Sequence, residues 1–273
     1  MTVLYSGCSF TAGVGWGSGW IDEKGQQCFN DCKHSKHLWV NLLHNRLFFD
    51  TPLDNIATGG NSNLRIFQTT ATALLTSKYS HAFVQWTSPM RYEWSAGLET
   101  WNTTIRSCVG SKQRTINLHN NVSYPGDYVQ ECFDRFILLE HEHYRLVQLI
   151  EYINILNRIA ELTNTHIYFI NGICKWDKDF FTRLDPSVPS DTTAYTQELI
   201  DLENRNDKDY KILYNKMHNE YQKAGTILED KWLNLYESMD NNIIDRNNDK
   251  SHAGIQSNKN FTSTFLQALK TKS

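Results

Sequence analysis

A serine near the start of the chain and a histidine near its end are the residues whose types and settings favour covalent chemistry. Ser9 follows an apolar run, residues 2–6, and a glycine, so it is expected at the tip of a strand where a helix opens. Asp249 and His252 stand three positions apart, which lets a carboxylate orient an imidazole. Together these side chains could form a nucleophile, a general base and an orienting acid. Taken singly, each is weak evidence, because serine is also a favoured helix cap.

Segments with strand and helix patterns alternate along the chain and predict how these residues are positioned. Strands are expected at 2–6, 53–56, 81–86 and 166–171, and helices at 37–48, 62–77, 128–163 and 258–270. This order predicts a three-layer α/β/α fold, flavodoxin-like, with a parallel sheet covered on both faces. In such sheets, sites lie beyond the carboxyl ends of the strands, where Ser9 is expected.

The same patterns predict the domain organisation and the buried faces of two helices. One domain is expected over residues 1–273, with insertions near 95–126 and 176–240 and a short buried segment near 241–244. The helix at 37–48 is expected to bury Leu38, Leu42, Leu43 and Leu47, and the helix at 62–77 to bury Leu64, Phe67, Ala71 and Leu74 or Leu75.

Three short motifs resemble conserved blocks of the SGNH hydrolases, also called GDSL hydrolases. Residues 7–11 (Gly-Cys-Ser-Phe-Thr) are similar to the first block, with Cys8 where that family most often has Asp. Asn55-x4-Gly60 is similar to the second block, and residues 249–252 to the last. Position in the chain adds to the match, because the three motifs occur in the family's order.

The resemblance implies a role for each matching residue. Ser9 would be the nucleophile, His252 the base and Asp249 the orienting acid, and the N–H groups of Ser9 and Gly60 would bind the oxyanion. The family needs no metal or organic cofactor for this chemistry. It implies hydrolysis of an acyl ester through an acyl-enzyme, with an O-acetyl group on a carbohydrate as the expected substrate.

The third block departs from the family pattern. Residues 85–91 read Gln-Trp-Thr-Ser-Pro-Met-Arg, without the Asn whose amide is the usual third oxyanion donor. A hydroxyl of Thr87 or Ser88 could donate instead, or Arg91 could approach the site. This variant resembles a subgroup common in bacteriophage-encoded members. Two other functions stay open: acyl transfer by the same triad, and a weakly active or inactive protein that binds with the same fold.

Two further residues near these motifs have a functional and a structural interpretation. The amide of Asn61 could reach the oxyanion, but Asn at a helix start is also a strong cap, and Asn61 or Ser62 could cap the helix at 62–77. Trp86 could stack on a sugar or an acyl group, but ordinary core packing is the favoured interpretation.

Composition excludes several classes of function. The chain has 273 residues and a formal net charge of −3, so a basic nucleic-acid-binding surface is not expected. No apolar run is long enough for a membrane span, and the first residues lack the pattern of a secretion signal. A cytoplasmic protein is expected, or one in the host cytoplasm or virion if the gene is phage-encoded. Its oligomeric state is left open.

One cluster of cysteine and histidine could bind zinc. Cys28, Cys32, His34 and His37 supply four possible ligands, but their spacing matches no familiar zinc pattern. A polar loop that carries these residues is the favoured interpretation, and a zinc-stabilised interaction module is the alternative. The six cysteines are too sparse for a disulfide scaffold and are expected to be reduced thiols.

Overall fold

The structure is a computed structural model that describes residues 1–15, 20–21, 27–28, 33–87, 91–94, 103–106, 115–118, 142–172, 229–234, 237–247 and 252–272. Its centre is a four-stranded sheet in the order β4-β1-β5-β9. The strands are β1 (Thr2–Ser6), β4 (Leu53–Asn55), β5 (Tyr79–Trp86) and β9 (His166–Asn171). All neighbouring pairs are parallel, so the four carboxyl ends meet at one edge. The predicted parallel sheet is confirmed.

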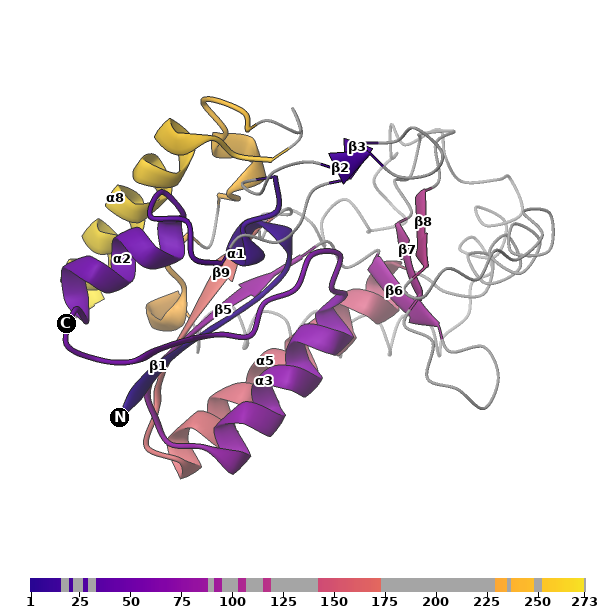
Figure 1. Ribbon diagram of the computed structural model, residues 1–273. Helices are drawn as coiled ribbons and strands as arrows, with labels where there is room; N and C mark the ends of the chain where they lie inside the picture. Colours follow the sequence, from indigo (N-terminus) through magenta and orange to yellow (C-terminus); the bar gives the residue numbers. More distant parts are fainter. Residues whose placement is uncertain are drawn as a thin grey trace, which may run out of the picture.

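Helices cover both faces of the sheet, as Figure 1 shows. On one face lie α2 (Trp39–Leu47) and α8 (Ile255–Lys272), and on the other α3 (Asn63–Thr76) and α5 (Glu142–Leu162). A single turn, α1 (Ser9–Ala12), follows β1 at the carboxyl edge. The three-layer prediction is confirmed. The predicted start of α5, residues 128–141, lies outside the described residues.

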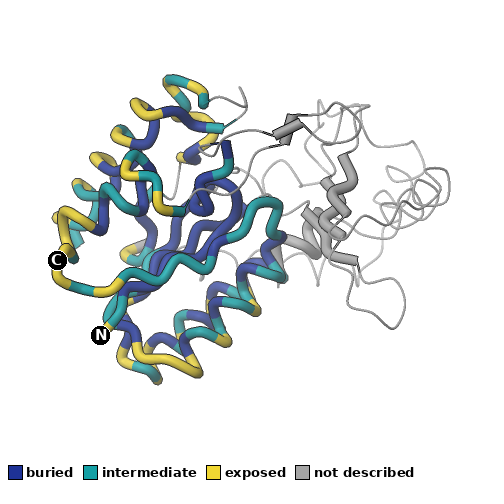
Figure 2. Tube along the Cα trace, viewed as in Figure 1, coloured by how far each residue is buried: buried dark blue, intermediate teal, exposed yellow. Residues whose placement is uncertain are grey.

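The core lies between the sheet and these helices, and Figure 2 shows the strands as its buried centre. Tyr5 of β1 stacks on Phe83 of β5, with ring centroids 5.1 Å apart. Trp39 of α2 meets Phe265 of α8 edge-on at 5.2 Å. The backbone N–H of Trp39, at the start of α2, also donates a hydrogen bond to Asn258 Oδ1 of α8 (2.9 Å). Asn258 thus accepts from one of the backbone donors that have no acceptor within the first turn of α2. Aromatic pairs thus join neighbouring strands within the sheet and neighbouring helices within one layer.

The buried face of α2 differs from the predicted one. Leu38 and Leu43 are buried as expected, but Leu47 is 42% exposed and His44 is buried in its place. His44 can be buried because one of its ring nitrogens forms a hydrogen bond with the Thr51 carbonyl (2.8 Å), which satisfies this polar group of the imidazole. Leu42 is only partly buried.

The buried face of α3 is also rotated from the prediction. Its buried residues are Asn63, Ile66, Thr70 and Leu74, whereas Leu75 is 65% exposed. Thr70 Oγ1 donates to Ser6 Oγ at the end of β1 (2.7 Å). The predicted members Leu64, Phe67 and Ala71 are partly buried, and Phe67 stacks on Tyr152 of α5 at 4.6 Å. Polar contacts with the sheet edge therefore set the orientation of this helix.

Short strands also lie outside the central sheet. A two-stranded antiparallel pair is formed by β2 (Trp20–Ile21) and β3 (Gln27–Cys28). A three-stranded antiparallel sheet is formed by β6 (Arg91–Trp94), β7 (Thr103–Arg106) and β8 (Thr115–Leu118). Two of these strands, β7 and β8, lie in the stretch expected to be an insertion near 95–126. The 176–240 stretch lies mostly outside the described residues.

Residues 229–234 run along the free edge of β9, and residues 237–242 contact its carboxyl end. They contain the 3-10 helices η1 (Glu229–Lys231) and η2 (Asp240–Asn242). Trp232 bridges Phe169 in parallel, and the side-chain amide of Asn234 pairs with the backbone N–H (2.8 Å) and carbonyl (2.9 Å) of Asn171. The buried segment predicted near 241–244 is wrong, since Ile244 is 63% exposed. Its neighbours in η2 are exposed because the turn lies on the surface.

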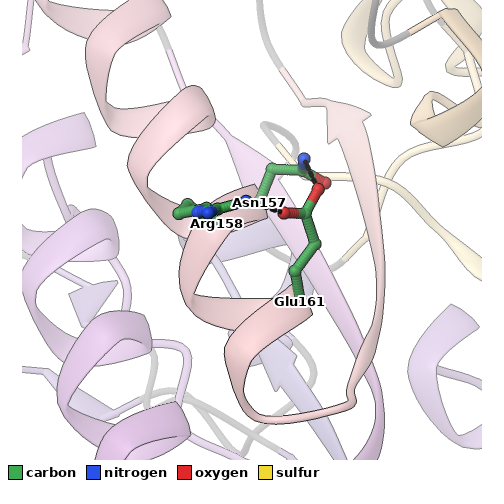
Figure 3. Close-up of polar contacts among 3 residues, drawn as sticks. All are labelled: Asn157, Arg158 and Glu161. Carbon is green, nitrogen blue, oxygen red and sulfur yellow. Dashed lines mark hydrogen bonds and ion pairs between the residues drawn. The ribbon is translucent and has the colours of Figure 1, made fainter.

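Three polar side chains near the end of α5 contact one another, as Figure 3 shows. Glu161 accepts hydrogen bonds from Asn157 Nδ2 (3.0 Å) and Arg158 Nη1 (2.9 Å). Both members of the Arg158–Glu161 ion pair are well exposed, so it contributes about 0.5 kcal/mol or less. Within the described ranges, no helix is both long and apolar enough to cross a membrane.

A half-buried histidine at the amino edge of the sheet gives a prediction about pH. The His81 ring stacks on His166 (5.2 Å) and lies against Phe48 (4.7 Å). Burial, and then the charge of His166, lower the pKa of His81 below its ordinary 6.5. A lowered histidine pKa gives stability that is complete above the unfolded pKa and declines as pH falls from there toward the folded pKa. We therefore expect the free energy of unfolding to fall between about pH 7.5 and 5.

His81→Phe should flatten this pH dependence, because it removes the group that must be protonated while keeping a ring against Phe48. Urea unfolding at both pH values measures the change. His34→Phe, at an exposed position, is the matched control and should leave the slope as it is. An equal pH dependence in His81→Phe and the wild type would contradict the assignment.

Candidate active site

The first part of the site is the turn between β1 and α1. Cys8 is the N-cap of α1 and Ser9 is its first residue, 5% exposed. Cys8 Sγ lies 3.9 Å from Ser9 Oγ. Gly7, the residue before them, lies where only a glycine fits without a shift. A Cβ at this position would be 2.8 Å from both Gln85 Oε1 and Thr11 Oγ1. The small residues of this turn thus allow β1 and β5 to approach closely just before Ser9.

A buried glutamine under this turn was not among the residues predicted for the site. Gln85, fully buried in β5, accepts hydrogen bonds from the Cys8 N–H (3.2 Å) and from Thr11 Oγ1 (2.8 Å). Its Nε2 donates to the Trp86 carbonyl (3.0 Å) and lies 3.1 Å from Cys8 Sγ. The available signal was an amide inside the apolar stretch at the end of β5, residues 82–86, because a buried amide needs partners.

The second part of the site is the loop after β4. Gly60 has φ 82°, a left-handed conformation that favours glycine. Within the described part of the chain, its N–H has no hydrogen-bond acceptor. Asn61 Nδ2 donates to the Gly7 carbonyl (3.1 Å), and Asn55 Nδ2 to the Thr11 carbonyl (2.9 Å). Two amides therefore hold this loop against the turn that carries Ser9.

These contacts separate the two interpretations of Asn61. Ser62, not Asn61, caps α3, because Ser62 Oγ accepts from the Arg65 N–H at 3.1 Å. The Asn61 amide binds the backbone of the Ser9 turn instead. A direct role at the oxyanion stays a prediction.

The third part of the site is the end of β5. The Thr87 N–H donates to Asn63 Oδ1 (2.9 Å), and Asn63 Nδ2 donates to the Thr87 carbonyl (3.2 Å). Thr87 is 2% exposed, and its Oγ1 has no hydrogen-bond partner among the described residues. A buried hydroxyl without a partner costs stability, and this one keeps unused hydrogen-bonding capacity at the end of β5.

The other predicted residues of this segment are placed less fully. Trp86 is 1% exposed and stacks near Phe169, with ring centroids 6.1 Å apart. Such burial favours core packing over contact with a substrate. Ser88 lies outside the described residues, and Arg91 is described only as the first residue of β6.

The fourth part of the site is a hairpin before α8. The Asn247 N–H donates to the His252 carbonyl (2.8 Å), and Arg246 pairs with Ala253. The His252 ring then lies edge-on against Phe10, 5.9 Å between centroids, beside Ser9 in the sequence. Residues from the two ends of the chain are thus neighbours. In the portion of the chain that the structure describes, no hydrogen bond joins Ser9 Oγ to the His252 ring. Asp249 lies outside the described residues.

A second aspartate, which no sequence motif indicated, anchors this hairpin to α8. Asp245 accepts hydrogen bonds from the Ser257 N–H (2.6 Å), Ser257 Oγ (2.6 Å) and the Gln256 N–H (2.9 Å). Burial raises the pKa of Asp245, but these hydrogen bonds outweigh it and lower the pKa overall. Both oxygens are directed to the start of α8, which explains why this helix begins at Ile255 rather than at the predicted residue 258.

The predicted zinc ligands are only partly described. His34 is exposed and His37 is half-buried, the backbone of Cys28 lies in β3, and Cys32 lies outside the described residues. Among the described residues, no group of at least three histidine, cysteine or acidic side chains could hold a metal ion. Zinc binding by the four residues together stays a prediction.

No protein-family model and no curated protein sequence matches the chain. The similar solved structures include TesA, at 11% identity over all of both chains with a TM-score of 0.45. A carbohydrate acetylesterase family member from Sinorhizobium meliloti is 11% identical over 100% of this chain and 99% of its own, with a TM-score of 0.45. A lipolytic G-D-S-L family member from Veillonella parvula is 9% identical over 99% and 98%, with a TM-score of 0.43. The chain's own sheet and layers define it as a three-layer α/β protein with Ser9 at the carboxyl edge.

Proposed function

We propose that this chain is a serine ester hydrolase with Ser9 as nucleophile and His252 as general base. The observation that carries the proposal is the meeting of distant segments at the carboxyl edge of the sheet. The turn with Ser9, the loop with Gly60 and the hairpin with His252 come together there. Asp249, three residues before His252, is the proposed orienting acid.

The reaction would proceed in two halves. Ser9 Oγ attacks the ester carbonyl while His252 takes its proton, and the imidazolium then returns that proton to the leaving alcohol. The bond from carbonyl carbon to alcohol oxygen breaks, which leaves an acyl group on Ser9. Water, deprotonated by His252, attacks the acyl carbon of this intermediate. The bond from that carbon to Ser9 Oγ breaks, the imidazolium returns the proton to Oγ, and the acid leaves.

Three donors are proposed for the oxyanion. The Ser9 and Gly60 N–H groups would provide two, and the unpaired Thr87 hydroxyl a third, where related enzymes have an Asn amide. Asn63 would fix Thr87 through its two backbone hydrogen bonds. Because Thr87 Oγ1 is already buried and unpaired, it would lose no internal hydrogen bond when it donates to the oxyanion.

The proposed substrate is a short acyl ester, with an O-acetyl group on a carbohydrate as the first choice. This choice follows from the family resemblance of the motifs rather than from the geometry. No cofactor is part of the proposed reaction.

Labelling with a fluorophosphonate probe tests the proposal, because the probe phosphonylates an activated serine. We expect wild-type protein to be labelled, Ser9→Ala to be unlabelled, and Ser80→Ala, at the opposite edge of the sheet, to be labelled like the wild type. Release of p-nitrophenol from its acetate ester without an added alcohol acceptor should follow the same pattern. Absence of wild-type labelling, or persistent labelling of Ser9→Ala, would refute the proposal, and turnover only with a sugar acceptor would assign acyl transfer instead.

A further inference from the structure

Gln85 is a polar side chain in the middle of the buried sheet that the proposed reaction does not use. It is fully buried, and both ends of its amide are occupied. Oε1 accepts from the Cys8 N–H and from Thr11 Oγ1, at 3.2 and 2.8 Å, while Nε2 donates to the Trp86 carbonyl at 3.0 Å. Burying an amide is costly unless it is hydrogen-bonded, so these contacts are what make Gln85 acceptable there.

The packing around Gln85 leaves room for this amide through two glycines. A Cβ on Gly7 would lie 2.8 Å from Gln85 Oε1, and a Cβ on Gly172 would lie 1.7 Å from Nε2. Gly7 follows β1 and Gly172 follows β9, so three adjacent strands contribute to the same small space. The amide therefore has little freedom to adopt another position.

The partners of Gln85 lie on both sides of the nucleophile. Cys8 precedes Ser9 and is the N-cap of α1, and Thr11 lies in the same turn. We infer that Gln85 is a positioning residue for Ser9: it fixes the turn from Cys8 to Thr11 and with it the direction of the Ser9 hydroxyl and N–H. This inference rests on the proposed role of Ser9. Because a shift of about 1 Å can reduce a rate about 100-fold, loss of these hydrogen bonds should be visible in the kinetics.

Gln85→Met tests the inference, since it keeps the length of the side chain and removes its hydrogen bonds. We expect the rate of fluorophosphonate labelling at Ser9 to fall about 10- to 100-fold and the loss in ester turnover to lie in kcat with KM little changed. The matched control is Thr70→Val, which removes buried hydrogen bonds to Ser6 Oγ (2.7 Å) and the Ile66 carbonyl (2.6 Å) at constant volume. It should label within about twofold of the wild type.

Amide hydrogen exchange gives a readout that does not depend on catalysis. In Gln85→Met, exchange in residues 7–13 should become faster, while exchange in α3 and α5 should stay unchanged. If Gln85→Met does not fold, Thr11→Val, which removes one hydrogen bond to Gln85, should slow labelling several-fold.

The outcomes separate the inference from the proposed function. Wild-type protein that never labels overturns the proposed function and the positioning role of Gln85 together. If the wild type is labelled and Gln85→Met is labelled at the same rate, the inference alone is overturned. Where Gln85→Met does not fold, an unchanged labelling rate in Thr11→Val overturns it in the same way. Unchanged exchange in residues 7–13 of the folded Gln85→Met variant likewise rejects a positioning role.

Discussion

His252→Ala is expected to lower kcat/KM for an acetate ester by about 1000-fold or more, while the protein stays folded. The proposed role of the imidazole is to take the proton from Ser9 and return it to the leaving alcohol, and no other described ring lies against Phe10 in its place. The hairpin should survive, because its contact with Asn247 uses the His252 carbonyl rather than the ring. Steady-state kinetics and the melting temperature together measure this result.

Two further measurements make this prediction specific. The limb of the pH–rate profile that reports deprotonation of the base should disappear in His252→Ala, and added imidazole should restore part of the rate. His166→Ala removes an exposed imidazole at the opposite edge of the sheet and should keep wild-type kinetics. A His252→Ala variant with wild-type turnover would show that another group acts as the base.

The sheet could be predicted from the sequence because its signals are local. Three of the four central strands, β1, β5 and β9, are short runs with apolar and β-branched or aromatic residues, and each is followed by a glycine or by a polar loop with a proline. The parallel arrangement follows from the alternation of these runs with helical patterns. Ser9, Gly60 and His252 were identified in the same way, from short motifs that lie at the ends of such elements.

The helix faces were predicted less well because apolar periodicity ignores buried polar groups. In α3, Thr70 and Asn63 are buried, since they hydrogen-bond Ser6 and the backbone of Thr87. In α2, His44 is buried and Leu47 is exposed for a similar reason. A polar residue with a partner in the sheet can thus replace an apolar residue on the inner face.

The supporting residues of the site could not be found from motifs because their partners are distant in the sequence. Gln85 and Cys8 are 77 positions apart, Asn63 and Thr87 are 24 apart, and Asp245 and Ser257 are 12 apart. A single sequence does not show which of many glutamines, asparagines and aspartates will meet such a partner. Their roles become visible only when the strands are side by side.

The second large effect is expected at Gly172, where alanine should destabilise the fold by about 3 kcal/mol. An added Cβ would lie 1.7 Å from Gln85 Nε2 and 2.7 Å from the Trp86 carbonyl oxygen. The backbone has little room to withdraw, since the Gly172 N–H donates to Trp86 (2.9 Å) and its carbonyl accepts from the Asp240 N–H (2.9 Å). Either Gln85 must leave its hydrogen bonds or the end of β9 must shift.

Urea unfolding of Gly172→Ala, Gln85→Ala and the double variant measures both the size and the cause of this effect. Shortening Gln85 removes the atom nearest the new methyl group, so the double variant should be less destabilised than the sum of the two single variants. Strict additivity would mean that Gly172 is needed for some reason other than the Gln85 side chain. A Gly172→Ala variant within about 0.5 kcal/mol of the wild type would mean that β9 ends with more freedom than its hydrogen bonds imply. Such freedom would also weaken the case that Gln85 is held rigidly beneath Ser9, because Gly172 forms one wall of the space that confines the amide.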